Sequence, residues 1–177
     1  ADFAPNEAGI AVTWDGEATT IVDVTASATG TWGPQTFVVP TTAALGYHTI
    51  AASGATTTTP IINVFTVLTP AIAIDLNTGQ RGTRVTVSGT NFAVSETLIV
   101  VKWDTTTVVT AFTAAADGSW GPKTFVVPTT ASLDAHTVDA SGAITTAADV
   151  ADVTFTVSTP AIAITPTSGP RGTTISV

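Results

Sequence analysis

The side chains best suited to chemistry in this chain are two histidines, and they occupy the same place in two copies of a repeat. His48 and His136 are each followed by threonine and an aliphatic residue, and each is the only histidine of its copy. The chain has no cysteine that could complete a zinc site or a nucleophile and base pair. We therefore predict structural histidines at strand edges, no cofactor, no metal and no enzymatic activity.

Three aspartates leave a calcium site open as an alternative. Asp15, Asp104 and Asp117 are oxygen ligands of the kind that calcium prefers, and they fall in turn-like segments. However, the chain contains no D-x-D-x-D loop, and the first copy has no counterpart of Asp117. The pattern therefore favours turn residues over a calcium site.

Four tryptophans are placed identically in the two copies. Trp14 and Trp103 lie within strand-like segments, so repeated core packing is the simpler interpretation for them. Trp32 and Trp120 stand in Trp-Gly-Pro segments, and for these two we keep the alternative of an exposed side chain that stacks on a sugar or contacts a neighbour. Threonine is also abundant and includes the run at 56–59, which indicates either strand propensity or O-linked glycans on Thr.

Composition sets the fold class. Of the 177 residues 44% are hydrophobic and 10% are charged, yet no apolar run reaches the roughly 18 residues of a membrane-spanning helix. The apolar residues are mainly Val, Ile and Ala mixed with Thr, which predicts an all-β chain. The net charge of −8, with five basic residues, leaves no basic patch for nucleic acid. We expect neither a membrane span nor a nucleic-acid partner.

The second copy of the repeat is divided into seven short segments that alternate polar and apolar residues and are separated by turn residues. Their spacing of about ten residues is typical of an immunoglobulin-like β-sandwich. The predicted strands are residues 70–76, 84–87, 97–103, 108–112, 123–127, 136–141 and 153–157.

Two glycine-rich turns carry a family resemblance. TGQRGTRVTVSGTNF at 78–92 and SGPRGTTISV at 168–177 resemble the opening of IPT/TIG domains, which are immunoglobulin-like modules of prokaryotic surface proteins. The tryptophan-bearing LIVVKWD at 98–104 and the ADGSWGPKTFVVP at 116–128 agree with this. The resemblance implies tandem sandwiches, an extracellular or cell-surface location, and a use as fibre unit, stalk, adhesin spacer or carbohydrate-associated domain.

The copies are offset by 88 to 90 residues, and one module is split between the two ends of the chain. We expect a front module lacking its first two strands at 1–68, a complete module at 69–158, and the first two strands of a further module at 159–177. A front sandwich without those strands would expose an apolar groove and strand edges. The donor residues that we expect to fill such a groove are Ile162, Ile164, Pro170, Arg171, Gly172, Ile175 and Val177.

The split module leads to two functional hypotheses. In the first, the chain is a subunit of an extracellular filament, and residues 159–177 complete the front module of the next identical subunit, head to tail. In the second, the chain is a two-module segment of a long tandem-repeat polypeptide, such as the stalk of a surface adhesin or glycan-binding protein. Both predict a fibre of sandwich modules, and they differ in whether the modules are joined covalently.

Overall fold

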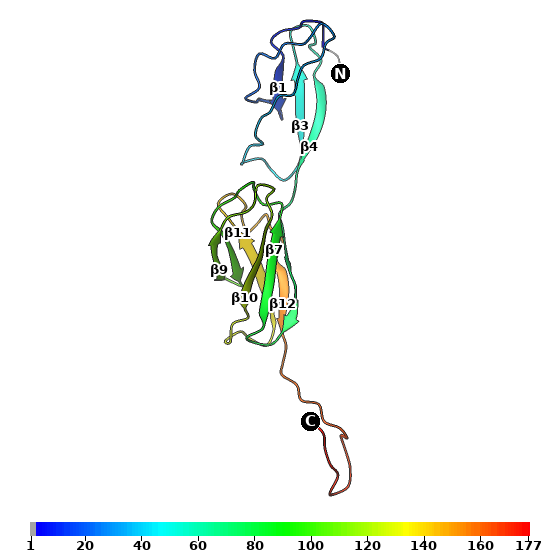
Figure 1. The fold of residues 1–177 in the computed structure, drawn as a ribbon, viewed down its shortest axis with the longest axis vertical. Helices are drawn as coiled ribbons and strands as arrows, with labels where there is room; N and C mark the ends of the chain where they lie inside the picture. Colours follow the sequence, from blue (N-terminus) through cyan, green and yellow to red (C-terminus); the bar gives the residue numbers. More distant parts are fainter. Residues whose placement is uncertain (1–2) are drawn as a thin grey trace. The chain divides into compact units, whose positions relative to one another are not determined.

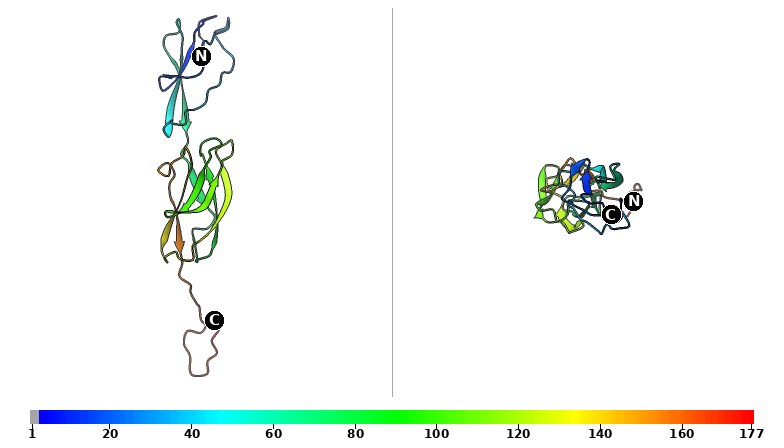
Figure 2. Two further views of the ribbon diagram at one scale, coloured as in Figure 1. Left: turned by 90° about the vertical axis from the view of Figure 1, so that its left-hand side faces the viewer. Right: turned by 90° about the horizontal axis from the view of Figure 1, so that it is seen from above.

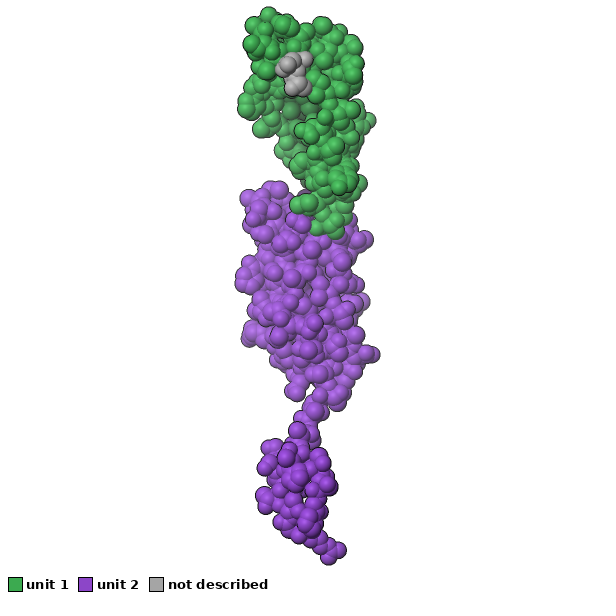
Figure 3. Space-filling model, turned by 90° about the vertical axis from the view of Figure 1, so that its right-hand side faces the viewer, with its two compact units in different colours: residues 1–69 green, residues 70–177 purple. Residues whose placement is uncertain are grey.

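The computed structural model describes residues 3–177, and this part of the chain is built from strands and loops with no helix. It divides into two compact units, unit 1 at 1–69 and unit 2 at 70–177 (Figure 3). Ala1 and Asp2, with which the expected front module begins, lie outside the described residues. Within 3–177 there is no helix long and apolar enough to cross a membrane.

Unit 2 contains two sheets that face each other across one core (Figures 1 and 2). The first sheet has the order β10-β7-β5, and the second has the order β6-β12-β11-β8-β9. All pairings are antiparallel except that of β12 with β6. The strands are β5 (Ala71–Ile74), β6 (Thr78–Gly79), β7 (Arg84–Thr90), β8 (Ile99–Trp103), β9 (Thr106–Phe112), β10 (Trp120–Val126), β11 (Ala135–Ser141) and β12 (Val153–Val157).

The core of unit 2 follows from the period-two alternation of these strands. Val85 and Val87 of β7, Val101 of β8, Val138 of β11 and Phe155 of β12 are each fully buried between the sheets. The alternating residues of the same strands face outward. Burial of large β-branched and aromatic side chains from both sheets is the main stabilising term of such a two-layer fold.

Each of the seven predicted strands of the second copy has its counterpart in unit 2, so the all-β prediction is confirmed. The alternation did not reveal β6, which lies inside the turn predicted after the first strand. Thr78 and Gly79 pair there with Thr156 and Val157 in parallel. A side chain at Gly79 would press on Thr83 and on the ring of Phe155, so glycine lets this short strand approach the core.

Unit 1 contains one sheet, with the order β2-β1-β3-β4. It matches the order β9-β8-β11-β12 of unit 2 strand for strand. The strands are β1 (Ala11–Trp14), β2 (Glu17–Ala18), β3 (Gly46–Ser53) and β4 (Ile61–Val67). In the part of unit 1 that the structure describes, no second sheet corresponds to β10-β7-β5.

Residues 159–177, which we call the tail, follow β12 as a loop with little regular structure (Figure 1). One isolated bridge joins Thr165 to Ser176, with N–H to O distances of 2.9 and 2.8 Å in the two directions. A further hydrogen bond runs from the Thr173 hydroxyl to the Pro170 carbonyl at 2.8 Å. The tail therefore keeps a bent hairpin shape while its side chains stay exposed.

Candidate functional site

The inner face of the unit 1 sheet is open where the matching face of unit 2 is covered. A groove of about 410 Å³ runs along it, and we call it the open groove. Its apolar walls are formed by Phe3, Val12, Trp32, Ile50, Ala52 and Ile61. The clearest consequence is at β4, where Phe65 is 42% exposed although its counterpart Phe155 is fully buried. An aromatic ring on the core side of a sheet is a strong candidate for an interaction site.

The structure separates the two tryptophans that the sequence grouped together. Trp120 is only 6% exposed and packs against Phe92 and Phe112, so the alternative of an exposed side chain that we kept open does not hold for Trp120. Trp32 is half-buried, and its ring meets Phe3 at a centroid distance of 4.7 Å on the wall of the open groove. The difference arises because β7 passes over Trp120 and no strand passes over Trp32. Trp14 and Trp103 are buried, as predicted.

A nearly identical segment has two different structures in the two units. Residues 32–43 and 120–131 agree at eleven of twelve positions and differ only at Gln35 and Lys123. In unit 2 this segment begins with β10, whereas in unit 1 residues 32–40 form no strand. Local propensity is the same in both, so the cause is tertiary. β10 has β7 as its ladder partner, and the matching segment of unit 1 has none.

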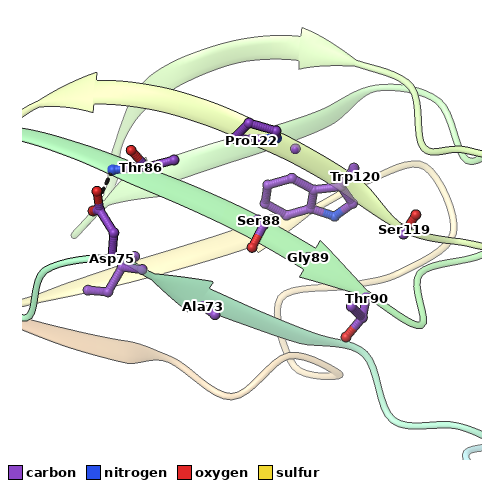
Figure 4. Close-up of a pocket in the computed structure, with 11 residues that line it drawn as sticks. Ala73, Asp75, Thr86, Ser88, Gly89, Thr90, Ser119, Trp120 and Pro122 are labelled. Atoms are coloured by element: carbon purple, nitrogen blue, oxygen red, sulfur yellow. Dashed lines mark hydrogen bonds between the residues drawn. The ribbon is translucent and has the colours of Figure 1, made fainter.

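In unit 2 the partner strand is held by packing as well as by the ladder. The indole of Trp120 lies against Gly89, where any β-carbon would collide with the ring (Figure 4). Asp75 accepts a hydrogen bond from the Thr86 N–H at 2.7 Å, which ties β5 to β7 (Figure 4). This bond lowers the pKa of Asp75. The β5 and β7 pair thus covers the inner face of its own unit as one hairpin.

The tail repeats the sequence of that hairpin but not its burial. Ile162, Ile164, Ile175 and Val177 match Ile72, Ile74, Val85 and Val87. The first three of the tail residues are well exposed and Val177 is 86% exposed, whereas Val85 and Val87 are fully buried. The tail thus exposes the same apolar side chains that, in unit 2, cover the inner face of the sheet.

The glycine-rich turn of the hairpin is held by two hydrogen bonds to backbone carbonyls. In unit 2 the Arg81 Nε–H donates to the carbonyl of Ala131 at 2.6 Å, and the Gly82 N–H donates to the carbonyl of Val127 at 2.9 Å. The tail places Pro170, Arg171 and Gly172 at the matching positions, and all three are exposed. The counterparts of the two acceptor carbonyls in unit 1 belong to Ala43 and Val39.

Each histidine is buried against a tryptophan and contacts an aspartate whose side chain is nearly half exposed. His48 stacks on Trp14 at a centroid distance of 4.6 Å, its Nδ1 contacts Asp15 Oδ2 at 2.6 Å and its Nε2 contacts the carbonyl of Ala44 at 2.7 Å. Both ring nitrogens face acceptors, so the protonated ring is favoured. The hydrogen bond to Asp15, followed by that to Ala44, raises the pKa of His48.

The cluster of unit 2 repeats this geometry. His136 stacks on Trp103 at 4.7 Å, and its Nδ1 contacts Asp104 Oδ2 at 2.8 Å. Burial is the largest influence on His136 and opposes its protonation, but the hydrogen bonds to Asp104 and the Ser132 carbonyl together with the nearby carboxylate charges outweigh it, so the pKa of His136 is raised. Asp15 and Asp104 also accept the N–H of Thr49 and of Thr137, which joins a turn to the sheet. Each cluster therefore acts as a structural clamp.

A buried glutamate organises the opposite end of each unit. Glu96 is 2% exposed and accepts the N–H groups of Ile144 and Thr145 at 2.7 and 2.6 Å, together with the Thr145 hydroxyl. Glu7 makes the same set of bonds to Thr56 and Thr57. These bonds, first that from the Thr57 N–H, lower the pKa of Glu7 to about 2. Sequence reasoning missed both glutamates, although their identical repeat position was a usable signal.

The three candidate calcium ligands lie in separate turns. Asp15 and Asp104 bind the histidines, and Asp117 accepts the Ser119 N–H and hydroxyl at 2.9 and 2.6 Å. Over residues 3–177, no three His, Asp or Glu side chains come close enough together to hold a metal ion. These aspartates act as turn and clamp residues in this fold.

Searches for similar proteins returned nothing: no family model, no curated protein and no solved structure matches the chain.

Proposed function

We propose that this chain is a structural unit of an extracellular filament in which the tail of one copy completes unit 1 of the next. In this proposal both units are immunoglobulin-like sandwiches, and the tail supplies the counterparts of β5 and β7. The observation that carries it is the segment shared by the two units, which is a strand in unit 2 and not in unit 1. The strand in unit 2 pairs with β7, and the matching segment of unit 1 has no such ladder partner among the described residues.

The repeat supplies a register for the docked tail. In unit 2, Thr86 pairs with Thr124 and Val87 with Lys123, so Ser176 would pair with Thr36 and Val177 with Gln35. Ile175 and Val177 would then enter the groove beside Trp32 and Phe37. Gly169 would lie on the exposed ring of Phe65, as Gly79 lies on Phe155. Each of these contacts has a formed counterpart in unit 2.

The contact would propagate into an open polymer. The donating surface is a hairpin and the accepting surface is a groove, so the interface is heterologous and does not close by two-fold symmetry. The linkers also repeat, because Thr-Pro at 69–70 and at 159–160 precedes the same Ala-Ile-Ala-Ile sequence, which is β5 at 71–74. Each junction is therefore expected to resemble the one before it.

Paired tail variants test the proposal. Ile175→Asp with Val177→Asp puts charges on the groove-facing side, whereas the control Thr174→Asp with Ser176→Asp puts them on the other side. Light scattering should find assemblies at multiples of 17.8 kDa for the unchanged chain and the control, and monomers for the first variant. Monomers of the unchanged chain, or equal assembly of both variants, would contradict the proposal.

The same complementation also suits a second function, a spacer in one long adhesin or glycan-binding polypeptide. The repeated linker favours this candidate, because it would join successive modules covalently in the same way. The mass of the native assembly under denaturing conditions distinguishes the two. A species near 17.8 kDa, plus any sugar, supports separate subunits, and a far larger one supports the spacer.

A further inference from the structure

The outer face of the unit 1 sheet carries an exposed apolar stripe that the core does not use and that borders the open groove only at Ile62. Tyr47, Ile62 and Val64 are 85%, 63% and 57% exposed, and we call them the outer stripe. Residues 63, 65 and 67 of β4 point to the groove side, so Ile62 and Val64 point away from it. Val64 pairs with Thr49, next to Tyr47 on β3, which makes the three side chains neighbours.

The fold itself does not require this stripe. In unit 2 the positions of Tyr47, Ile62 and Val64 are occupied by Ala135, Asp152 and Thr154, and that of Ala51 by Asp139. The same sheet face is therefore polar and acidic in one unit and apolar in the other. A requirement of the fold would apply to both units, so the fold alone does not account for the stripe.

We propose that the outer stripe is a lateral contact that packs against the same stripe of a second copy and joins neighbouring polymers side by side. This inference rests on the proposed function for the polymer, although the contact itself is a property of unit 1. A face that meets its own copy across a two-fold axis is isologous. Each such contact therefore joins one filament to another and lengthens neither.

Charge favours a second copy as the occupant. Residues 1–69 contain five acidic residues and no Lys or Arg, and the whole chain carries a net charge of −8. Two copies therefore repel each other over most of their surfaces. The stripe and its outward neighbours Thr49, Ala51 and Thr66 are uncharged, so two copies avoid opposed carboxylates when these faces meet. Unit 1 has no Lys or Arg that could bind an anionic membrane.

The stripe is small, so we expect its contact to be stable only when many copies act together in a polymer. Three side chains bury at most a few hundred Å², well below the roughly 800 Å² per partner of a standard stable interface. Single chains should therefore pair only weakly. A polymer presents the stripe once per unit, so many weak contacts act together and their effect multiplies.

The test replaces the stripe with the residues that unit 2 has at these positions, Tyr47→Ala, Ile62→Asp and Val64→Thr. The matched control is Val94→Thr, which changes an apolar side chain of unit 2 that is 71% exposed. We expect polymers of the unchanged chain and the control to form bundles in electron micrographs. The triple variant should give single filaments of unchanged length and about a tenfold loss of polymer pelleted at low speed.

Other outcomes overturn the inference. Bundling that persists in the triple variant, or bundles absent from the unchanged chain, would contradict it. Binding of filaments to phosphatidylcholine vesicles that the triple variant abolishes, without bundling, would assign the stripe to a lipid surface instead. If no polymer forms, the proposed function fails separately. The stripe is then tested on monomers at millimolar concentration, where concentration-dependent amide shifts on β3 and β4 support it and unchanged shifts refute it.

Discussion

The histidine clusters link the protonation state of single residues to the stability of each unit. The pKa of His48 lies above its ordinary value of 6.5, and that of Asp15 lies below its ordinary value of 3.8. The raised histidine pKa stabilises the fold fully below pH 6.5, and this contribution is lost as pH rises through the raised value. The lowered aspartate pKa stabilises above pH 3.8 and is lost in acid.

We therefore expect the thermal midpoint of the unchanged chain to fall between pH 5 and pH 9, because His48 and His136 release their protons. The variant with both His48→Gln and His136→Gln should lose most of this slope and should be less stable at pH 5. Scanning calorimetry across this range measures both effects. An equal slope in the variant would show that other groups cause the pH dependence.

Glycine positions offer a test of local packing. Gly118 and Gly82 both have positive φ, of 76° and 83°, but a β-carbon on Gly118 would collide with the carbonyl of Phe92 whereas one on Gly82 meets nothing within 4 Å. Gly82→Ala should lower the free energy of unfolding by about 1 kcal/mol, because alanine is strained at positive φ. Gly118→Ala should cost clearly more, because it adds the collision. Urea unfolding monitored by tryptophan fluorescence, in a background with Trp14→Phe and Trp32→Phe so that only unit 2 reports, measures the difference. Equal costs would contradict the described turn.

At the level of the element, we expect residues 35–39 to become a strand when the tail docks. Hydrogen exchange on the variant with Ile175→Asp and Val177→Asp should find these amides unprotected. Adding a synthetic peptide of residues 159–177 should slow their exchange by roughly a hundredfold, the local stabilisation expected of a formed ladder. The matching amides at 123–127 serve as the internal control. Protection at 35–39 without peptide would contradict this prediction.

The tail turn should contribute a measurable part of the docking energy. Arg171 is expected to donate its Nε–H to the Ala43 carbonyl, as Arg81 does to Ala131. Because a hydrogen bond from a charged donor is worth about 1.5 to 3 kcal/mol, Arg171→Ala should weaken peptide binding at least tenfold. Thr174→Ala, on the exposed side of the hairpin, should leave it nearly unchanged. Calorimetric titration of the peptides measures both, and equal affinities would remove Arg171 from the contact.

Seven of the eight strands of unit 2 were predictable from sequence, because their alternation and their turn residues agree with the tertiary fold; β6 was not. The shared segment at 32–43 was not, since its propensity is identical to that of 120–131 and its structure depends on a distant partner strand. The Asp15 and Glu7 clusters also escaped prediction. Their partners lie 33 and 50 residues away in sequence, and only the sheet brings them together.

At the level of the whole molecule, unit 1 has one sheet among its described residues, whereas unit 2 has two. The His48 and Glu7 clusters of unit 1 repeat the His136 and Glu96 clusters of unit 2, so unit 1 keeps these internal contacts, while its described residues form no second sheet. The tail has the sequence of the missing hairpin and no buried contacts of its own. Docking of the tail on unit 1 of another copy would cover the open groove and bury the apolar side chains of the tail in one contact.

The most direct test is a disulfide between Thr36→Cys and Ser176→Cys, the pair expected from the register of Thr124 with Thr86. The chain has no other cysteine, so every crosslink reports this contact. Oxidation should give a non-reducing ladder at multiples of 17.8 kDa. The shifted pair Thr36→Cys and Thr174→Cys should give little. A monomer with an internal crosslink, no crosslink at all, or equal ladders for both pairs would contradict strand donation between copies.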